Sequence, residues 1–196
     1  MGEKTDKELY HEFLQENMTS FEEIIIRHKD KLIYFIMRYV KNIDIAEDLA
    51  QDVFVYILIH RQSYDFNYSL KTYLFTIAKS KSLNYLKREN KISSLDENSI
   101  IDLQDLEEKV FLNERKNNLK IAMQKLKPEY QNAIYLADIE ELSYKEISQI
   151  MKKPESSIKV LIHRARKNLK EILKKDLLNV ESIIKDTGNV VWKNSK

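Results

Sequence analysis

The scarcity of glycine and proline constrains this chain more than any other feature of its sequence. Only two residues of each type occur among 196 residues. Folds built from sheets need many tight turns, and glycine and proline supply the backbone angles that such turns require. Charged residues make up 33% of the chain and hydrophobic residues 43%, a balance typical of amphipathic helices. The sequence therefore predicts an all-α fold.

Apolar residues recur at spacings of three and four, which indicates helices. Such patterns cover residues 21–39, 44–60, 70–88 and 106–127. Asp44 is the predicted N-cap of the second helix, and Pro128 stands where a further helix often begins. Residues 91–112 carry six acids against two lysines, and the first half of this stretch has no clear period. We expect this stretch to be flexible.

These patterns predict two small helical domains on an acidic tether. The expected boundaries are a first domain at residues 1–92, a linker at 93–112, a second domain at 113–178 and a tail at 179–196 that contains Trp192. The absence of cysteine excludes disulfides and thiolate metal sites. No apolar run approaches the length needed to span a bilayer, and the first residues do not resemble a signal peptide. We expect a cytoplasmic protein with no cofactor and no membrane partner.

Residues 143–170 predict a helix-turn-helix motif. Ser143 and Glu146 form a capping box at the start of a short helix. A turn at residues 152–154 leads to a second helix that begins near Glu155 and is apolar on one side and basic on the other. Between Lys159 and Lys175 there are seven lysines or arginines and one acid. This arrangement is typical of a helix that enters the major groove of DNA, and a hairpin with a solvated charged face is the alternative.

Two features stand out in the first half of the chain. An acidic arc on the helix at 44–60 fits a basic partner, a metal ion or simple solvation; it consists of Asp44, Glu47, Asp48, Gln51 and Asp52. Aromatic residues interleave with lysine and arginine between Tyr64 and Arg88, and residues 71–91 hold six basic residues and one acid. Aromatic rings beside cations suit unpaired bases, because every base offers a face for stacking. Tyr73 and Phe75 could instead be core residues.

Two stretches resemble regions of bacterial sigma factors. Region 2 is similar to FEEIIIRHKDKLIYFIMRYVKNIDIAEDLAQDVFVYI followed by SLKTYLFTIAKSKSLNYLKRE. Region 4 is similar to LKPEYQNAIYLADIEELSYKEISQIMKKPESSIKVLIHRARKNLKEIL. Since only a short acidic stretch separates them, the chain resembles the two-domain extracytoplasmic-function (ECF) sigma factors over roughly residues 21–175. The resemblance implies a transcription initiation factor that catalyses no reaction itself.

The resemblance also implies partners for the first domain. The acidic helix would dock on the clamp helices of the RNA polymerase β′ subunit through Glu47, Asp48, Gln51 and Asp52. The aromatic and basic segment would recognise and melt the −10 promoter element and hold a flipped non-template base. The residues implied there are Phe66, Asn67, Tyr68, Ser69, Tyr73, Lys79, Ser80, Lys81, Asn84, Lys87 and Arg88.

The second domain would read the −35 element and contact the polymerase β flap. The residues implied are Ser143, Tyr144, Lys145, Glu155, Ser156, Ser157, Lys159, Val160, His163, Arg164, Arg166 and Lys167. We expect mainly phosphate contacts from the basic members of this set. ECF factors are usually held by an anti-sigma factor, which the resemblance implies as a candidate partner.

Several residues depart from the family pattern. Tyr73 stands where the family usually has Trp, and Ser80 where Asn is common. Lys152 and Ser156 occupy usual glycine positions, and a left-handed Lys152 would cost about 1 kcal/mol relative to glycine. Val160 and Leu161 stand where Ser and Arg are common. Since arginine is the main reader of guanine, we predict weak −35 readout and a further protein that helps to place the factor.

Two other functions fit parts of the sequence. A helix-turn-helix regulator that binds duplex DNA as a dimer would use the basic helix but would not need the acidic arc. An all-α nucleotide hydrolase could hold Mg²⁺ with carboxylates, and its candidates are Glu22, Glu23, Glu47, Asp48 and Asp52. The hydrolase would leave the basic helix-turn-helix unexplained, and the sequence has no phosphate-cradling glycine loop.

Overall fold

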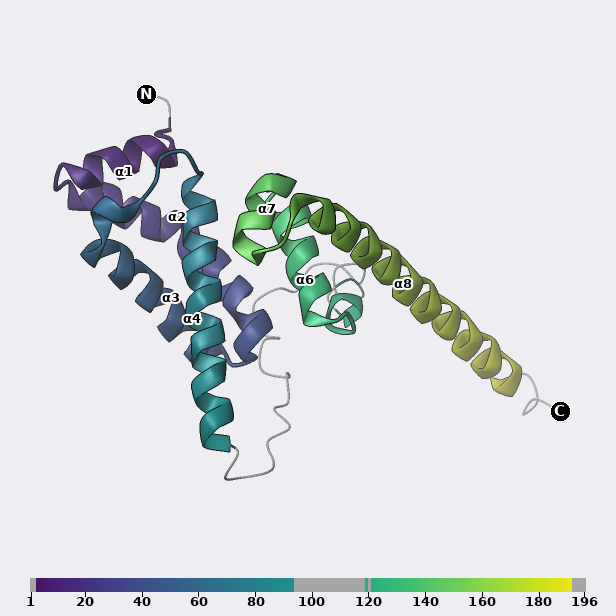
Figure 1. Cartoon of the computed structure of the whole chain (residues 1–196). Coiled ribbons are helices and arrows are strands. Elements are labelled where there is room, and N and C mark those ends of the chain that lie inside the picture. The colour runs from purple at the N-terminus through teal and green to yellow at the C-terminus, as the bar shows by residue number, and fades with distance from the viewer. Residues whose placement is uncertain (1–2, 94–118, 120, 192–196) are drawn as a thin grey trace.

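A computed structural model describes residues 3–93, 119 and 121–191 of the chain. The regular structure of these residues is entirely helical, which confirms the all-α prediction (Figure 1). The elements are α1 (Asp6–Leu14), α2 (Met18–Val40), α3 (Ile43–Ile59), the 3₁₀ turn η1 (Arg61–Ser63), α4 (Leu70–Ser93), α6 (Pro128–Ile134), the π-helical turn η3 (Tyr135–Ile139), α7 (Tyr144–Met151) and α8 (Glu155–Val191).

Helix α1 was not expected from the apolar pattern. It begins with a capping box in which Thr5 and Glu8 satisfy each other's backbone N–H groups. Phe13 is fully buried and stacks on Phe21 of α2, with ring centroids 4.4 Å apart. The capping box TDKE is the sequence signal that would have found this helix.

Helices α2, α3 and α4 complete the first bundle, with α2 packed against both of the others. The apolar stripe predicted for α2 is buried at Ile24, Leu32 and Ile36. The predicted cap of α3 was wrong: Asn42, not Asp44, accepts the hydrogen bond from the N–H of Ile45 at 3.0 Å. Asp44 lies in the first turn instead, where a carboxylate is favoured by the helix dipole.

The second half contains the predicted helix-turn-helix in α7 and α8. Pro128 opens α6, and Ser143 and Glu146 form the expected capping box of α7. Lys152 ends α7 in the left-handed region with φ 54°, as its position in place of glycine predicted. Between α6 and α7 the N–H of Glu140 donates to the carbonyl of Tyr135, five residues earlier, and this bond closes the π-helical turn η3.

Helix α8 continues to Val191, through most of the stretch that we expected to be a tail (Figure 1). Leu, Lys and Glu recur through residues 169–185, and these are good helix formers. Trp192 and the predicted linker beyond residue 93 lie outside the described residues. Among the helices that are described, none is both long and apolar enough to cross a membrane.

The two halves pack against each other. In Figure 1, α4 stands between the α1–α3 group and the shorter helices of the second half. Helix α7 packs against α4, and α6 contacts α2. One continuous set of buried apolar residues crosses this boundary, from Leu74 and Phe75 of α4 to Ile147 and Ile150 of α7.

We predict that Phe13→Ala lowers the free energy of unfolding by about 3–5 kcal/mol, because it removes a fully buried ring and leaves a cavity. Urea denaturation followed by circular dichroism measures the change. Met18→Ala is the matched control, because Met18 is 46% exposed and lies at the start of α2. A similar loss of stability in both variants would contradict the placement of α1 in the core.

Candidate nucleic-acid interface

The side of α8 that faces away from the core is basic. Ile158, Ile162 and Ala165 are buried against the other helices, as the apolar stripe predicted. The residues predicted to contact DNA from this helix are all exposed, namely Glu155, Ser156, Ser157, Lys159, Val160, His163, Arg164, Arg166 and Lys167. Since α8 has its positive charge on one solvent-facing side, it can follow a phosphate backbone.

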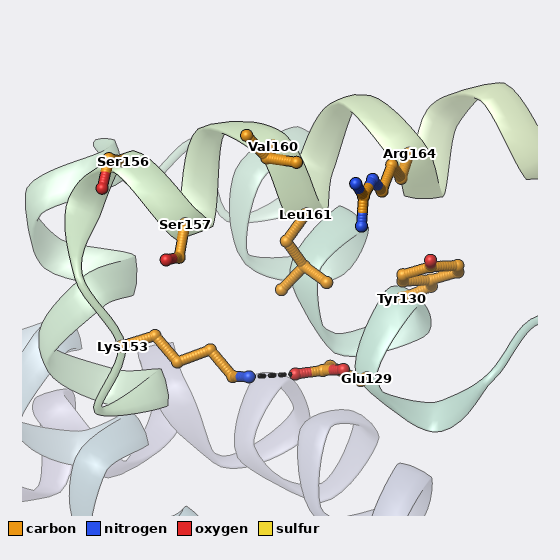
Figure 2. Close-up of a pocket in the computed structure, with 8 residues that line it drawn as sticks. All are labelled: Glu129, Tyr130, Lys153, Ser156, Ser157, Val160, Leu161 and Arg164. Atoms are coloured by element: carbon orange, nitrogen blue, oxygen red, sulfur yellow. Dashed lines mark ion pairs between the residues drawn. The ribbon is translucent and has the colours of Figure 1, made fainter.

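A hollow of about 470 Å³ lies between α6 and the first turns of α8. Figure 2 shows Leu161 pointing down into this hollow, while Val160 lies on the outer side of α8. Val160 is 47% exposed, whereas Leu161 is half-buried and packs on the core. Lys153 and Glu129 pair across the hollow at 2.7 Å. Val160 is therefore the apolar residue that this part of the helix presents to a groove.

Two other predicted −35 residues are held by neighbours. The Nε of Arg166 donates to Asp138 of η3 at 3.2 Å, and this hydrogen bond raises the pKa of Arg166. Tyr144 is half-buried and packs against the core. Arg166 and Tyr144 therefore help to hold the helix-turn-helix together, and they also belong to its predicted DNA-binding surface.

The loop at residues 64–69 is fixed by hydrogen bonds. The hydroxyl of Tyr64 donates to the carbonyl of Tyr68 at 2.7 Å, and the N–H of Asn67 donates to Asp65 at 2.9 Å. Burial raises the pKa of Tyr64 to about 12, so its hydroxyl keeps its proton near neutral pH. Asn67 and Tyr68 are exposed on this braced loop.

Phe66 and Tyr73 are less accessible to an incoming base than the sequence indicated. Phe66 stacks on His11 of α1 with centroids 4.2 Å apart, and it also lies 4.7 Å from the ring of Tyr64. Tyr73 is half-buried beside Tyr64 at 5.3 Å, and its hydroxyl has no partner among the described residues. The ring most open to an incoming base is Tyr68, which is 42% exposed. The stacking of His11 on Phe66 was not predicted, because His11 lies 55 residues before Phe66 in the sequence.

The predicted DNA-binding residues of α4 point in two directions. Ser80, Asn84, Lys87 and Arg88 are exposed. Lys81 turns toward α3, where its Nζ lies 3.5 Å from Asp52. The latter contact joins the predicted −10 surface to the predicted acidic arc.

The acidic arc on α3 continues into an apolar surface. Glu47, Asp48, Gln51 and Asp52 are all exposed. Val55 and Ile59 follow at helical spacing and are 51% and 69% exposed. We call the stripe formed by Asp48, Asp52, Val55 and Ile59 the α3 stripe. Its apolar half was missed, although the run VFVYILI is apolar on all sides, which indicates a helix that packs on two faces.

The described residues contain no group of three or more His, Asp or Glu side chains that could hold a metal ion together. The carboxylates considered for a nucleotide hydrolase belong to α2 and α3, and they are not gathered into such a group.

Some predicted site residues face the other half of the molecule. Ser69 donates to Glu146 Oε1 of α7 at 2.5 Å. Lys79 donates from Nζ to the carbonyls of Ile150 and Met151 at 3.1 and 2.8 Å. Burial lowers the pKa of Lys79, and the nearby Lys152 and Lys153 lower it further. Residues predicted for the −10 element thus contact the helix-turn-helix directly.

Comparison with family models finds two matches. Residues 24–92 match Sigma-70 region 2, and residues 117–169 match Sigma-70, region 4. Helix α1 precedes the first matched range.

Curated relatives cover most of the chain. The ECF RNA polymerase sigma factor SigM of Bacillus subtilis is 30% identical over 78% of this chain and 94% of its own length. The RNA polymerase sigma factor YlaC of the same organism is 29% identical over 80% of this chain and 93% of its own length.

Solved structures share the fold. The sigma factor RpoE of Bartonella quintana, in complex with the anti-sigma factor NepR, superposes with a TM-score of 0.69 and 23% identity. That match covers 79% of this chain and 96% of the other. CnrH, in complex with the cytosolic domain of CnrY, gives a TM-score of 0.62 and 18% identity over 87% of this chain and 98% of the other.

We predict that the basic face of α8 binds duplex DNA mainly through phosphates. Lys159→Gln with Lys167→Gln should weaken binding and make the log–log salt slope shallower by about 1.8, because each lost phosphate contact removes about 0.9. Fluorescence anisotropy at several salt concentrations measures the slope. Lys29→Gln with Lys41→Gln removes the same charge from exposed sites in the first half and should leave the slope unchanged. Equal slopes for both double variants would contradict the assignment.

Proposed function

Because the chain belongs to the ECF RNA polymerase sigma factors, we propose that it uses the α3 stripe to dock on core polymerase and the loop at 64–69 to open promoter DNA. Sigma factors are initiation factors that bind core RNA polymerase and promoter DNA. They supply recognition, and the polymerase supplies the chemistry. We infer that this chain makes and breaks no bond and works in the cytoplasm, where the polymerase meets DNA.

The docking proposal rests on the exposed α3 stripe. Val55 and Ile59 leave apolar surface in water beside Asp48 and Asp52. An apolar patch with charge at one end is typical of a protein interface. The acids would meet basic residues of the β′ clamp helices, while Val55 and Ile59 would supply the desolvated centre of the contact.

The braced loop supports the proposal for the −10 element. Melting must overcome stacking of about 1.4 kcal/mol per base step. A base stacked on an aromatic ring returns roughly 1–3 kcal/mol. Tyr68 has the exposure for this role, with Asn67 beside it to donate and accept hydrogen bonds. Ser80, Asn84, Lys87 and Arg88 would then guide the separated strand along α4.

Region 4 would bind the −35 element mainly through phosphates and would contact the β flap. Val160 offers a base only methyl contacts, and Leu161 turns toward α6. Weak reading of −35 bases fits a second protein that helps to place the factor on its promoter. An anti-sigma factor is a further proposed partner, because the related RpoE of Bartonella quintana was solved in complex with one.

Charge reversal tests docking. Asp48→Lys with Asp52→Lys should weaken binding to core RNA polymerase roughly 100-fold or more, because like charges would then meet at the interface. Biolayer interferometry with core polymerase measures the affinity. Glu22→Lys with Asp30→Lys is the control, since it makes the same charge change at exposed positions of α2. If the control weakens binding equally, the docking surface is not the α3 stripe.

Truncation of the exposed ring tests melting. Tyr68→Ala should lower the open-complex equilibrium about 5- to 150-fold, which corresponds to the loss of one stacked base. The fluorescence of 2-aminopurine in the −10 element of a promoter bound to the holoenzyme measures opening. Tyr34→Ala removes another exposed tyrosine, from α2, and should have no effect. Normal opening by Tyr68→Ala would remove Tyr68 from the proposed site.

A further inference from the structure

Helix α1 lies outside the range that matches Sigma-70 region 2, yet it packs against the loop that is proposed to open DNA. The connection from α3 to α4 runs beside α1 (Figure 1). The hydroxyl of Tyr10 donates to the carbonyl of Arg61 at 3.0 Å, and its ring lies 4.6 Å from that of Tyr64. His11 stacks on Phe66 with the two rings nearly parallel, 10° apart. Two consecutive side chains of α1 therefore support one side of the loop.

A second hollow, of about 320 Å³, lies between the first turn of α1 and this loop. We call it the α1 hollow; residues 5–7 form one wall, and Tyr64 with residues 68–71 forms the other. Its volume falls within the range of about 300–1,000 Å³ that is usual for pockets that bind small molecules. Tyr68, the ring most open to an incoming base, lines this hollow. A base that leaves the duplex and stacks on Tyr68 would therefore enter a space that α1 closes on one side.

An anchor to α2 fixes the position of the first turn of α1. The two carboxylate oxygens of Asp6 accept hydrogen bonds from Nε2 of His28 at 2.7 Å and from Arg27 at 3.4 Å. His28 is buried, and its hydrogen bond lowers the pKa of Asp6, so this carboxylate is charged near neutral pH. Asp6 therefore turns toward α2, and the backbone of the next residue, Lys7, is held beside the α1 hollow.

Lys7 is the cation at the α1 hollow that remains available to a base. The hydroxyl of Thr5 is used in the capping box of α1, and the ammonium of Lys71 lies 3.2 Å from the carboxylate of Glu140. Lys7 is exposed, and its ammonium makes no ion pair within the part of the chain that the structure describes. It lies 6.0 Å from the centroid of the Phe66 ring, on the side of α1 that faces the loop.

An ammonium group can distinguish bases by the group that it meets on their edge. It carries three donors and no acceptor. Thymine and guanine present a carbonyl oxygen at the place where cytosine and adenine present an amino group. The ammonium can donate to the carbonyl oxygen, whereas it would meet only donors at the amino group. One hydrogen bond to a charged group is strong enough to favour the carbonyl bases about tenfold.

We propose that the α1 hollow receives the base that stacks on Tyr68, and that Lys7 selects thymine or guanine there over cytosine and adenine. Lys7 is then a specificity-determining residue supplied by a helix that the region 2 match does not include. This inference rests on the proposed function of the loop, which supplies the unpaired base. It adds which bases the site accepts and which residue decides between them.

Selection from single-stranded DNA measures the base preference. Holoenzyme assembled from core RNA polymerase and the full chain is mixed with a library of strands randomised across the −10 element. Sequencing of the bound strands gives the frequency of each base at each position. Tyr68→Ala identifies the captured position, because the preference there should be lost when the stacking ring is removed.

Variants of Lys7 change its hydrogen-bonding groups step by step. The parent chain should favour thymine and guanine about tenfold at the captured position. Lys7→Gln should remove this preference, because an amide both donates and accepts, and Lys7→Glu should reverse it, because a carboxylate only accepts. Glutamate is favoured in the first turn of a helix, so the fold should be kept. Lys29→Glu makes the same charge change at an exposed residue of α2 and should leave the preference unchanged.

The outcomes separate the role of Lys7 from the proposed function of the loop. The same order of bases in the parent and in Lys7→Glu would overturn the role of Lys7, as would a parent that favours cytosine or adenine. An equal loss of affinity for all four bases would also overturn it, because Lys7 would then contact only phosphate. In each of these cases a preference that depends on Tyr68 leaves the proposed function standing. If Tyr68→Ala changes the preference at no position, base capture by the loop fails, and the inference fails with it.

Discussion

One short helix, α7, packs against α4 and joins the two halves of the structure. Its N-terminus is fastened through Glu146, its C-terminus through Lys79, and its buried face continues the core of the first half. The same contact decides which surfaces remain free. The basic face of α8, the α3 stripe and Tyr68 stay open to solvent, whereas Ser69 and Lys79 are engaged. The molecule thus holds part of its proposed DNA surface as an internal interface.

Local interactions made much of the fold predictable. The Ser143 capping box, the proline at the start of α6 and the left-handed Lys152 are all decided by residues within one helical turn, and the sequence predicted each of them. The cap of α3 was misassigned because Asn and Asp are both good caps, and the pattern alone did not distinguish Asn42, which caps the helix, from Asp44, which lies in its first turn. The packing of α7 on α4 was not predictable, since Ser69 and Glu146 are 77 residues apart.

The candidate site was likewise predictable where it depends on one helix, and it was not predictable where it depends on several segments. Charge patterns on single helices predicted the exposed acids of α3 and the basic face of α8. Features that depend on several segments were missed, such as the stacking of His11 on Phe66 and the pairing of Lys81 with Asp52. The exposed Val55 and Ile59 were missed because an apolar run on a helix does not reveal which side the core covers.

As an ECF sigma factor, this chain should direct core RNA polymerase to start transcription at chosen sites. Sequencing of RNA 5′ ends produced by core polymerase on genomic DNA from the same organism, with and without the chain, tests it most directly. We expect new start sites that appear only with the chain and share a sequence about ten base pairs upstream. An identical set of start sites in the two reactions would contradict it.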